Sequence, residues 1–534
     1  MTIRPLTIGF VIDEKNGLPT WELLSLQELI RSEFISSITL IILPEQDQKP
    51  RRNEESFGLV CFKKFENVWF KNKQDAALVV NLDAIHDPFR KLKSIKINMD
   101  SPTLPPEVDL LYLCYKLRDV SIFNPPIYGI WKVVFGKNNA EGNLPGFWEV
   151  MNRESITESR LVIQISENSS VVIACHSIAS TISFSVKNNF NSIALKTSHY
   201  LLQRVRELYL TDKATFFSKR LKFSFEPNAN INIRSREPGS LKMLCLFLRN
   251  IYFYLLYKIS KFSGKEIFML FYAFGKLDIH SIDFKKYSRL QPPPKKFWAD
   301  PFVIHKGQEH FIFFEEGYYP GGKGRIAVMK IDIEGKCSER KIIIEEPYHL
   351  SYPFVLEIDG NYYIIPESSA NKTVDVYHCE EFPYKWKFYR RLLNNIVLQD
   401  STLFHHGDIW WLFATTKDPL EYTSNDQLMI YYSSDIFSGE WHSHPCNPVI
   451  TDVSNCRPAG KIFVQDKRIF RPAQNNSCGQ YGYSIRINEI EILTKTEYRE
   501  KMINEISPLK FPTFAAMHTI NADGNMIVID GIMS

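Results

Sequence analysis

The stretch 300–316 reads DPFVIHKGQEHFIFFEE and has the pattern of two short strands joined by a tight turn. Asp300 precedes an apolar run, Lys306-Gly307 supplies turn residues, and a second, aromatic-rich run ends on two glutamates. The same layout recurs in four later stretches, 352–367, 400–415, 457–474 and 518–530. A single tight turn with Gly or Asp is an ordinary hairpin signal, but five in the same order indicate a repeated structural unit.

The spacing of these repeats predicts the fold. Their first residues are separated by 52, 48, 57 and 61 positions, and four strands with their turns need about 40–55 residues. Each repeat is therefore one four-stranded blade. We predict an all-β five-bladed propeller over 286–534, preceded by other domains.

The first strand of each blade lines the central channel of a propeller, so matched repeat positions converge on one axis. The residues at this position are Asp300, Tyr352, Asp400, Arg457 and His518. A structural role, in turn formation or in a hydrogen bond between blades, would reuse one residue type. Because these residues differ, the set favours a binding or catalytic role.

Carboxylates also end the second strands, at Glu315 and Glu367, with Glu316, Gln474 and Asp530 at comparable places. Glycosyl chemistry needs one carboxylic acid to protonate a departing oxygen and one carboxylate to attack or activate the acceptor. We predict catalytic roles for Asp300, Asp400, Glu367 and Glu315. Planar guanidinium groups suit a phosphate or sugar acid, and the residues predicted to bind substrate are Glu316, His349, Tyr352, Arg457, Arg471, Gln474 and His518.

Residues 1–215 have an α/β pattern. Apolar runs at 6–12, 38–43, 78–81 and 109–113 alternate with a helical stretch at 21–32, as in buried parallel strands joined by crossover helices. The chain has no G-x-G-x-x-G and no P-loop. A dinucleotide or ATP site is therefore unsupported.

Residues 216–285 are predicted to be a linker that contains a basic amphipathic helix. The run 242–265 has five basic residues and no acidic residue. One interpretation is a helix on an anionic membrane surface, and the other is an interdomain helix buried on one side. The five basic residues are Lys242, Arg249, Lys258, Lys261 and Lys265.

Composition limits the class of protein. The 534 residues are 44% hydrophobic and carry a net charge of only +4, which argues against nucleic-acid binding by bulk electrostatics. Nine unpatterned cysteines fit a reducing compartment and provide no zinc site. Without a signal peptide or a spanning segment, we expect a cytoplasmic protein, which the membrane interpretation of 242–265 would place on the inner face of the membrane. No metal site or cofactor is predicted beyond a nucleotide-sugar donor, and a calcium ion held by channel carboxylates stays open.

A resemblance to known proteins rests on FWADPF (297–302), FFEE (313–316), PYHLSYPF (347–354), PESSANKTVDVY (366–377) and HTIN (518–521). With these motifs the run from Lys296 to Ile532 resembles the propeller-type region of plant glucosamine inositolphosphorylceramide transferases and of bacterial proteins from surface-polysaccharide loci. The resemblance implies glycosyl transfer, with a sugar or glycolipid substrate, in the synthesis of a bacterial surface polysaccharide or glycolipid.

A more distant likeness is to the arabinanase, xylosidase and invertase group of five-bladed glycoside hydrolases. Carried over by blade position, their two aspartates and glutamate fall on Asp300, Asp400 and Glu367. The later blade that should supply an acid has Arg457 instead, a departure that suits a transferase or a binding protein at least as well as a hydrolase.

The N-terminal region resembles the formyltransferase fold in VDLLYL (108–113), YGIWKV (128–133) and PGFWEV (145–150). The asparagine and histidine of that family fall near Lys132 and Val134, and its aspartate within 167–170. Valine cannot act as an acid or a base. We therefore expect a Rossmann-like, formyltransferase-type domain that is inactive and serves as a scaffold or recognition module.

Three functions follow from these patterns. The first is glycosyl transfer by the propeller. The second is hydrolysis of a glycosidic bond, which needs carboxyl groups about 5–5.5 Å or about 6.5–9.5 Å apart. The third is carbohydrate binding or scaffolding without catalysis.

Overall fold

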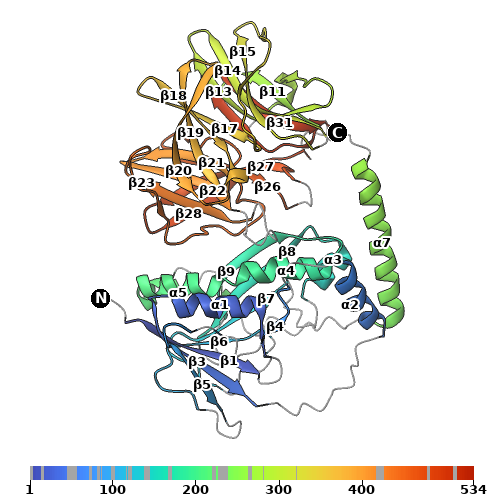
Figure 1. The fold of residues 1–534 in the computed structure, drawn as a ribbon, viewed down its shortest axis with the longest axis vertical. Coiled ribbons are helices and arrows are strands. Elements are labelled where there is room, and N and C mark those ends of the chain that lie inside the picture. Colours follow the sequence, from blue (N-terminus) through green and yellow to red (C-terminus); the bar gives the residue numbers. More distant parts are fainter. Residues whose placement is uncertain are drawn as a thin grey trace. The chain divides into compact units, whose positions relative to one another are not determined.

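The computed structural model of the chain divides into two compact units, residues 1–257 and 258–534, each of which is described by itself (Figure 1). The structure shows no disulfide among the eight cysteines that it describes. Each helix in the described part is too short or too polar to cross a bilayer. The described residues are 4–13, 17–44, 57–70, 75–80, 85, 87–97, 103–115, 117, 123–136, 145–165, 171–218, 220, 224–225, 238–262, 267–280, 282–319, 321–416, 426–477, 481–508 and 514–533.

The first unit is built on an eight-stranded sheet with the order β10-β9-β8-β7-β6-β1-β3-β5. The five strands from β7 to β5 are parallel, and β8, β9 and β10 continue the sheet in antiparallel order. The strands are β1 (Leu6–Asp13), β3 (Ile35–Leu43), β5 (Leu92–Lys96), β6 (Leu110–Leu113), β7 (Ile130–Phe135), β8 (Ile156–Gln164), β9 (Val171–Ser180) and β10 (Ser224–Phe225).

Seven helices are described in this part of the chain: α1 (Thr20–Arg31), α2 (Phe57–Trp69), α3 (Phe147–Asn152), α4 (Val186–Thr197), α5 (Tyr200–Leu210), α6 (Lys213–Ser218) and α7 (Ser240–Phe262). The predicted strands at 6–12, 38–43 and 109–113 and the helix at 21–32 are present. The predicted strand at 78–81 is only the two-residue β4 (Val79–Val80), which pairs with β2 (Leu18–Pro19) outside the main sheet.

The parallel strands have the order of a doubly wound sheet, in which ligands usually bind at the carboxyl ends of the central strands. Here Tyr115 follows β6 and Phe135 ends β7, and their rings lie 5.3 Å apart. Trp21 and Phe190 pack on the same pair, at 5.7 and 5.5 Å from Phe135. Aromatic side chains therefore occupy this end of the sheet.

The predicted likeness to formyltransferases rests on positions that the structure only partly describes. Lys132 and Val134 lie on β7, and both are partly buried. The range Glu167–Ser170 lies outside the described residues. The likeness stays a prediction.

The second unit is the predicted five-bladed propeller, with one sheet for each blade. Blades 1 to 4 are β13-β14-β15-β16, β17-β18-β19-β20, β21-β22-β23-β24 and β25-β26-β27-β28. Their strands are β13 (Lys296–Lys306), β14 (Glu309–Tyr318), β15 (Arg325–Asp332), β16 (Lys341–Ile344), β17 (Ser351–Ile358), β18 (Asn361–Glu367), β19 (Thr373–Glu381), β20 (Lys385–Asn394), β21 (Leu398–His406), β22 (Ile409–Thr416), β23 (Leu428–Ser433), β24 (His442–Ser443), β25 (Phe463–Gln465), β26 (Arg468–Asn475), β27 (Ser484–Leu493) and β28 (Tyr498–Ile506).

Blade 5 closes the ring with strands from both ends of the unit. Its inner strand is β30, which pairs with β31, and β31 pairs in turn with β11 and β11 with β12. The strands are β11 (Phe268–Phe274), β12 (Ser288–Leu290), β29 (Phe514–Ala516), β30 (Ile520–Asp523) and β31 (Met526–Met533). The strand β11 thus lies within the range that the sequence analysis gave to the linker, and it completes a blade.

The backbone explains the register of the repeats. Asp300, Tyr352 and Asp400 each lie nine residues before the first residue of the second strand, at a break in pairing, and have φ of 52°, 44° and 53°. This left-handed conformation is costly for residues other than glycine. Arg457 lies eleven residues before its second strand and His518 eight. Asp300, Tyr352 and Asp400 therefore occupy equivalent positions in their blades. Arg457 and His518 reach the axis from positions one or two residues away from the equivalent one.

The contact between blades 4 and 5 gives a test of the closed ring. Gly460 has φ of 134°, and a Cβ there would lie 2.0 Å from the carbonyl oxygen of Ile520. We expect Gly460→Ala to lower the free energy of unfolding of the propeller by about 3 kcal/mol, because the backbone must move. Gly407→Ala is the matched control, since Gly407 has φ of 61° with open space around it, and should cost about 1 kcal/mol. Calorimetry that finds equal shifts in Tm would contradict the closed ring.

Candidate functional site

The inner strands bring polar side chains together at the axis of the propeller. β13 packs against β17 and β30, and β17 packs against β21. Seven of the gathered side chains are ionisable and all are buried. They are Asp300, Glu315, Glu367, Asp400, Arg457, His518 and Asp530, and we call them the channel cluster.

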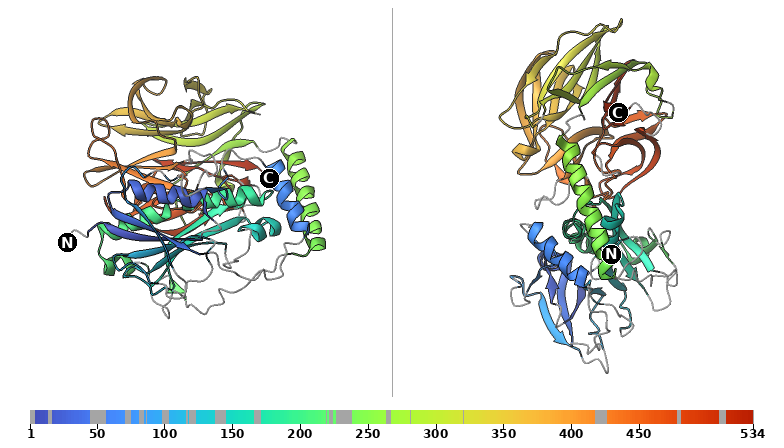
Figure 2. Two further views of the ribbon diagram at one scale, coloured as in Figure 1. Left: turned by 60° about the horizontal axis from the view of Figure 1, so that its bottom comes forward. Right: turned by 90° about the vertical axis from the view of Figure 1, so that its right-hand side faces the viewer.

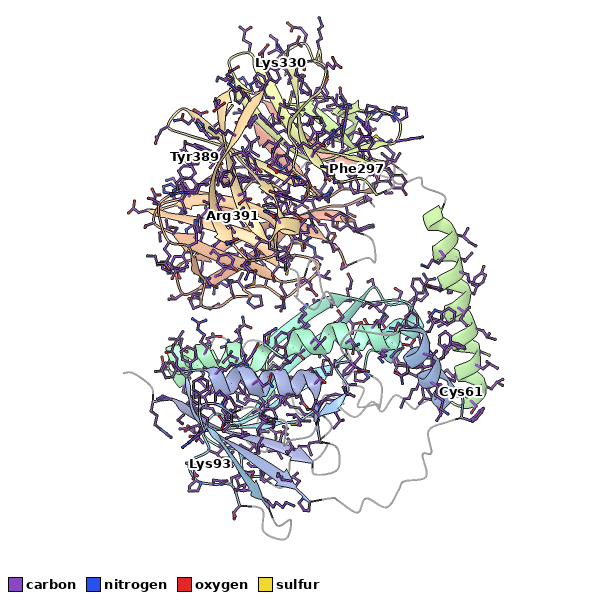
Figure 3. All side chains as sticks on the ribbon, in the orientation of Figure 1. Cys61, Lys93, Phe297, Lys330, Tyr389 and Arg391 are labelled. Carbon is purple, nitrogen blue, oxygen red and sulfur yellow. The ribbon has the colours of Figure 1, made fainter. Side chains whose placement is uncertain are left out.

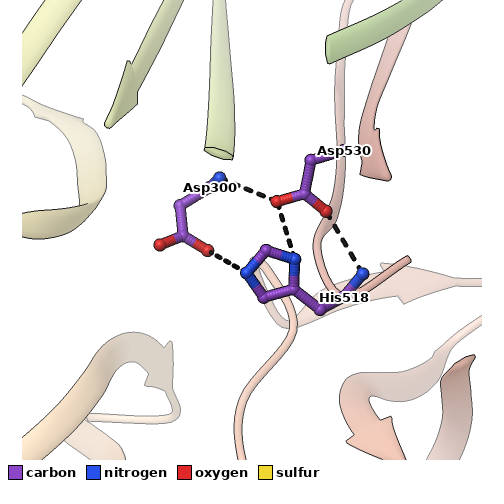
Figure 4. A group of neighbouring side chains, drawn as sticks. All are labelled: Asp300, His518 and Asp530. Atoms are coloured by element: carbon purple, nitrogen blue, oxygen red, sulfur yellow. Dashed lines mark hydrogen bonds and ion pairs between the residues drawn. The ribbon is translucent and has the colours of Figure 1, made fainter. Parts of the chain in front are cut away.

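One half of the channel cluster is a histidine held between two aspartates (Figure 4). The Nε2 of His518 lies 3.3 Å from Asp300 Oδ1, and its Nδ1 lies 2.9 Å from Asp530 Oδ2. Thr519 Oγ1 donates to Asp300 Oδ1 at 2.9 Å, and the backbone N–H of Asp300 donates to Asp530 Oδ2 at 2.8 Å. These contacts join blade 5 to blade 1.

Electrostatics make this histidine a cation. Burial alone would lower the pKa of His518, but Asp530 and Asp300 outweigh it and raise the pKa to about 10. Burial would likewise raise the pKa of Asp300, and His518, Arg457 and the Thr519 hydroxyl together lower it below its ordinary value. At neutral pH the imidazolium therefore faces an ionised Asp300.

The other half of the channel cluster is built around Arg457. Its Nε and Nη2 donate to the two oxygens of Asp400 at 2.5 and 3.1 Å, and Nη2 lies 3.6 Å from Glu367 Oε2. Gln474 Nε2 also donates to Asp400 Oδ2, at 3.0 Å. Although burial would lower the pKa of Arg457, Asp400 and Glu367 raise it well above its ordinary value. Arg457 is thus a fixed partner of carboxylates.

Burial raises the pKa of both Asp400 and Glu315 well above the ordinary carboxyl value, but Asp400 has the Arg457 guanidinium as a partner, whereas Glu315 has no guanidinium partner among the described residues. Its Oε1 has no hydrogen-bond partner among the described residues, and His349 Nε2 lies 3.3 Å from it. Burial, with the charges of Asp300 and Glu367, raises the pKa of Glu315 well above its ordinary value. Burial and the neighbouring charges therefore favour the protonated form of Glu315, the form that a general acid needs.

His349 connects Glu315 with solvent. Its side chain is 42% exposed, and its Nδ1 accepts a hydrogen bond from the N–H of Gly324 at 2.8 Å, so that Nε2 faces Glu315. A Cβ at Gly324 would lie 2.3 Å from Glu315 Oε1. The close approach of this loop to the acid therefore requires glycine.

Tyr352 and Tyr481 complete the surroundings of the cluster. Tyr352 is fully buried, and its hydroxyl contacts Thr402 Oγ1 and accepts from the N–H of Gly460, both at 2.8 Å. Tyr481 is 42% exposed, and its ring centre lies 5.0 Å from the Arg457 guanidinium and 5.3 Å from the His518 ring. An exposed aromatic face beside buried charges suits a sugar ring, which has an apolar and a polar side.

Two of the predicted substrate-binding residues lie elsewhere. Glu316, the neighbour of Glu315 on β14, points to the other face of the strand and pairs with cations of blade 1. Its partners are Lys296, Arg325, Arg340 and the indole N–H of Trp298. Arg471 is paired with Glu500 through Nε and Nη2, at 2.7 and 2.6 Å. Both residues are blade-internal ion pairs and are not part of the channel cluster.

Sequence reasoning assigned no role to Asp530, Thr519 or Tyr481. Asp530 was visible as a polar residue at the end of the fifth repeat, and Thr519 as the neighbour of His518. Tyr481 belongs to no repeat position, so no pattern marks it.

The geometry also bears on a metal ion. Ligand atoms of Asp300, His518 and Asp530 lie within 4.8 Å of one another. The two ring nitrogens of His518, however, face different aspartates, and both carry a proton when the ring is charged. A divalent cation bound by these three residues would have to displace an imidazolium proton.

The charge state of His518 gives a prediction about pH. A charged His518 contributes to the free energy of unfolding fully below the ordinary imidazole pKa of about 6.5, and this contribution is lost as pH rises to about 10. We expect the difference in Tm between wild type and His518→Gln to shrink over this window. His442→Gln, at an exposed histidine on β24, is the control. A difference that does not change with pH would show that His518 is neutral.

Comparison with known proteins identifies relatives of the propeller. Residues 287–510 match the protein family described as glucosamine inositolphosphorylceramide transferase 1, N-terminal, which confirms the predicted resemblance. The transferase of that name from Oryza sativa subsp. japonica is 35% identical over 216 residues, which cover 40% of this chain and 28% of the relative. The Arabidopsis thaliana protein of the same name is 36% identical over 211 residues, covering 39% and 27%. The chain thus spans little more than a quarter of these relatives.

Solved structures with a similar arrangement include a family 117 glycoside hydrolase from Zobellia galactanivorans, at 12% identity and a TM-score of 0.34, covering 50% of this chain and 90% of that chain. Another is the catalytic domain of a GH62 alpha-L-arabinofuranosidase from Coprinopsis cinerea, at 10% identity and a TM-score of 0.33, covering 44% and 90%.

Proposed function

We propose that the propeller channel binds a glycosyl group and transfers it to an acceptor, in the synthesis of a surface polysaccharide or glycolipid. The proposal rests on two buried carboxyl groups whose pKa values are shifted in opposite directions: that of Glu315 is raised and that of Asp300 is lowered. Relatives of the propeller carry the name glucosamine inositolphosphorylceramide transferase 1, which supports a sugar donor and a lipid-linked acceptor here.

The chemistry follows from these two pKa shifts. Glu315 would protonate the oxygen that leaves the anomeric carbon, and His349 would return a proton to it from solvent. Asp300, held ionised by His518, would face the positive charge that develops on the sugar ring, as nucleophile or base. Glu367 and Asp400, fixed by Arg457, add negative potential that stabilises an oxocarbenium-like centre.

The charge of the channel limits the donor. Among the described residues, the cations paired with carboxyl groups of the cluster are Arg457 and His518. A diphosphate would therefore enter a negative channel unless a divalent cation accompanied it. The predicted nucleotide-sugar donor fits only with its diphosphate outside the cluster or bound to such a cation.

Hydrolysis is the second candidate, because the same acid and carboxylate would act on a glycoside with water as acceptor. Carbohydrate binding without catalysis is favoured by a different observation: Asp300 and Asp530 also join blades 5, 1 and 2. An assay of the full chain with nucleotide sugars and aryl glycosides distinguishes the three functions. A transferase yields a transferred sugar, a hydrolase yields a free sugar, and a binding protein yields a complex without turnover.

Glu315→Gln tests the proposed acid. Glutamine copies the shape of the protonated acid but cannot give up a proton, so we expect turnover to fall by at least about a hundredfold while Tm stays equal or rises. Glu345→Gln, at a glutamate with a 46% exposed side chain, should leave both unchanged. Full turnover in Glu315→Gln would exclude this acid.

Asp400→Asn is a less informative variant. It leaves the guanidinium of Arg457 without its bidentate partner in a buried site, which costs about 3–5 kcal/mol. Loss of activity with loss of Tm in this variant would report on folding, whereas loss of activity in Glu315→Gln at unchanged Tm reports on chemistry.

A further inference from the structure

The helix α7 has one face packed in the first unit. Met243 is buried, and Phe247 contacts the rings of Phe62 and Phe65 on α2 at 5.8 and 4.7 Å. Leu246 joins the same hydrophobic cluster. This face fixes the rotation of the helix about its own axis. Figure 2 shows α7 lying beside α2.

The opposite face of α7 is apolar and exposed. Seven large side chains on it have exposed fractions between 42% and 77%. At 100° per residue they fall within an arc of about 120°, the width of the apolar face of a surface helix. They are Leu241, Leu244, Leu248, Tyr252, Leu255, Leu256 and Ile259, and we call them the outer stripe. Figure 3 shows side chains of α7 standing away from α2 and its labelled Cys61.

Basic residues border the outer stripe on both sides. Lys242 lies about 100° to one side of its centre, and Lys258 lies about 100° to the other. No acidic residue occurs between Ser240 and Phe262. Long basic side chains at the edges of an apolar face can reach phosphates while the face itself is buried.

The polar residues that interrupt the apolar run face the protein. Arg249 donates to the backbone carbonyl of Met151, and Asn250 Nδ2 donates to the carbonyl of Phe184 at 3.3 Å. They therefore leave the outer stripe continuous. The side chain of Lys261 and all of Lys265, both in the predicted basic run, lie outside the described residues.

We propose that α7 lies in the headgroup region of an anionic bilayer, with the outer stripe among acyl chains and the bordering cations on lipid phosphates. An exposed apolar stripe of this length marks an interaction surface, and a border of one sign selects a negatively charged partner. A second copy of this chain would bring its own cations against these cations. The inference is independent of the chemistry of the propeller.

Co-sedimentation of the full chain with vesicles tests the proposal. We expect binding to phosphatidylcholine vesicles that contain phosphatidylglycerol, weaker binding to phosphatidylcholine alone, and weaker binding as salt rises. Leu244→Glu with Leu248→Glu should reduce binding at least about tenfold. The matched control is Leu78→Glu with Leu210→Glu, at leucines that are 63% and 57% exposed elsewhere in the same unit, and it should bind like wild type.

The charges have their own variant. Lys242→Gln with Lys258→Gln should weaken binding and flatten its dependence on salt, while the circular dichroism spectrum stays unchanged. Wild type that does not bind anionic vesicles, or an equal loss in the control pair, would overturn the proposal. A concentration-dependent dimer in size exclusion that Leu244→Glu with Leu248→Glu abolishes would also overturn it, because a second copy would then cover the stripe.

Discussion

Around the axis of the propeller, a carboxylate of one blade accepts a hydrogen bond from the next blade. Asp530 accepts from the N–H of Asp300, Asp300 from the N–H of Tyr352, and Glu367 from the N–H of Asp400. Asp400 accepts in turn from Arg457. Each contact places negative charge in a buried channel, and two cations, Arg457 and His518, face it.

This arrangement has a consequence for the fifth carboxyl group. Glu315 is not part of this series of contacts between blades. The two cations, Arg457 and His518, are already paired with the neighbouring carboxylates. Ionising it would add an unpaired charge to a site of low dielectric, which is costly. The contacts that close the ring of blades therefore also favour the protonated form of Glu315, so the fold and the proposed chemistry depend on the same interactions.

The sequence predicts the blades well because five hairpins share one order, and each hairpin fixes the register of its strands. The sequence predicts the site less well where a shift of one residue along a strand decides which way a side chain points. Glu315 and Glu316 are neighbours in sequence, yet a strand directs them to opposite faces, and only pairing with β13 and β15 shows which reaches the axis. The sequence likewise does not show that Arg471 is held inside its blade, because its partner Glu500 lies two strands away, on β28. The closing strand β11 belongs to no repeat, so no pattern could assign it to blade 5.

Direct observation of the Glu315 proton tests the account best. Infrared spectra of the full chain at neutral pH should contain the band of a protonated carboxyl group, and this band should be missing from Glu315→Gln and present in Glu345→Gln. A spectrum in which Glu315→Gln removes only carboxylate absorption would show that Glu315 is ionised. It would contradict the claim that Glu315 stays protonated because Arg457 and His518 are already paired with other carboxylates.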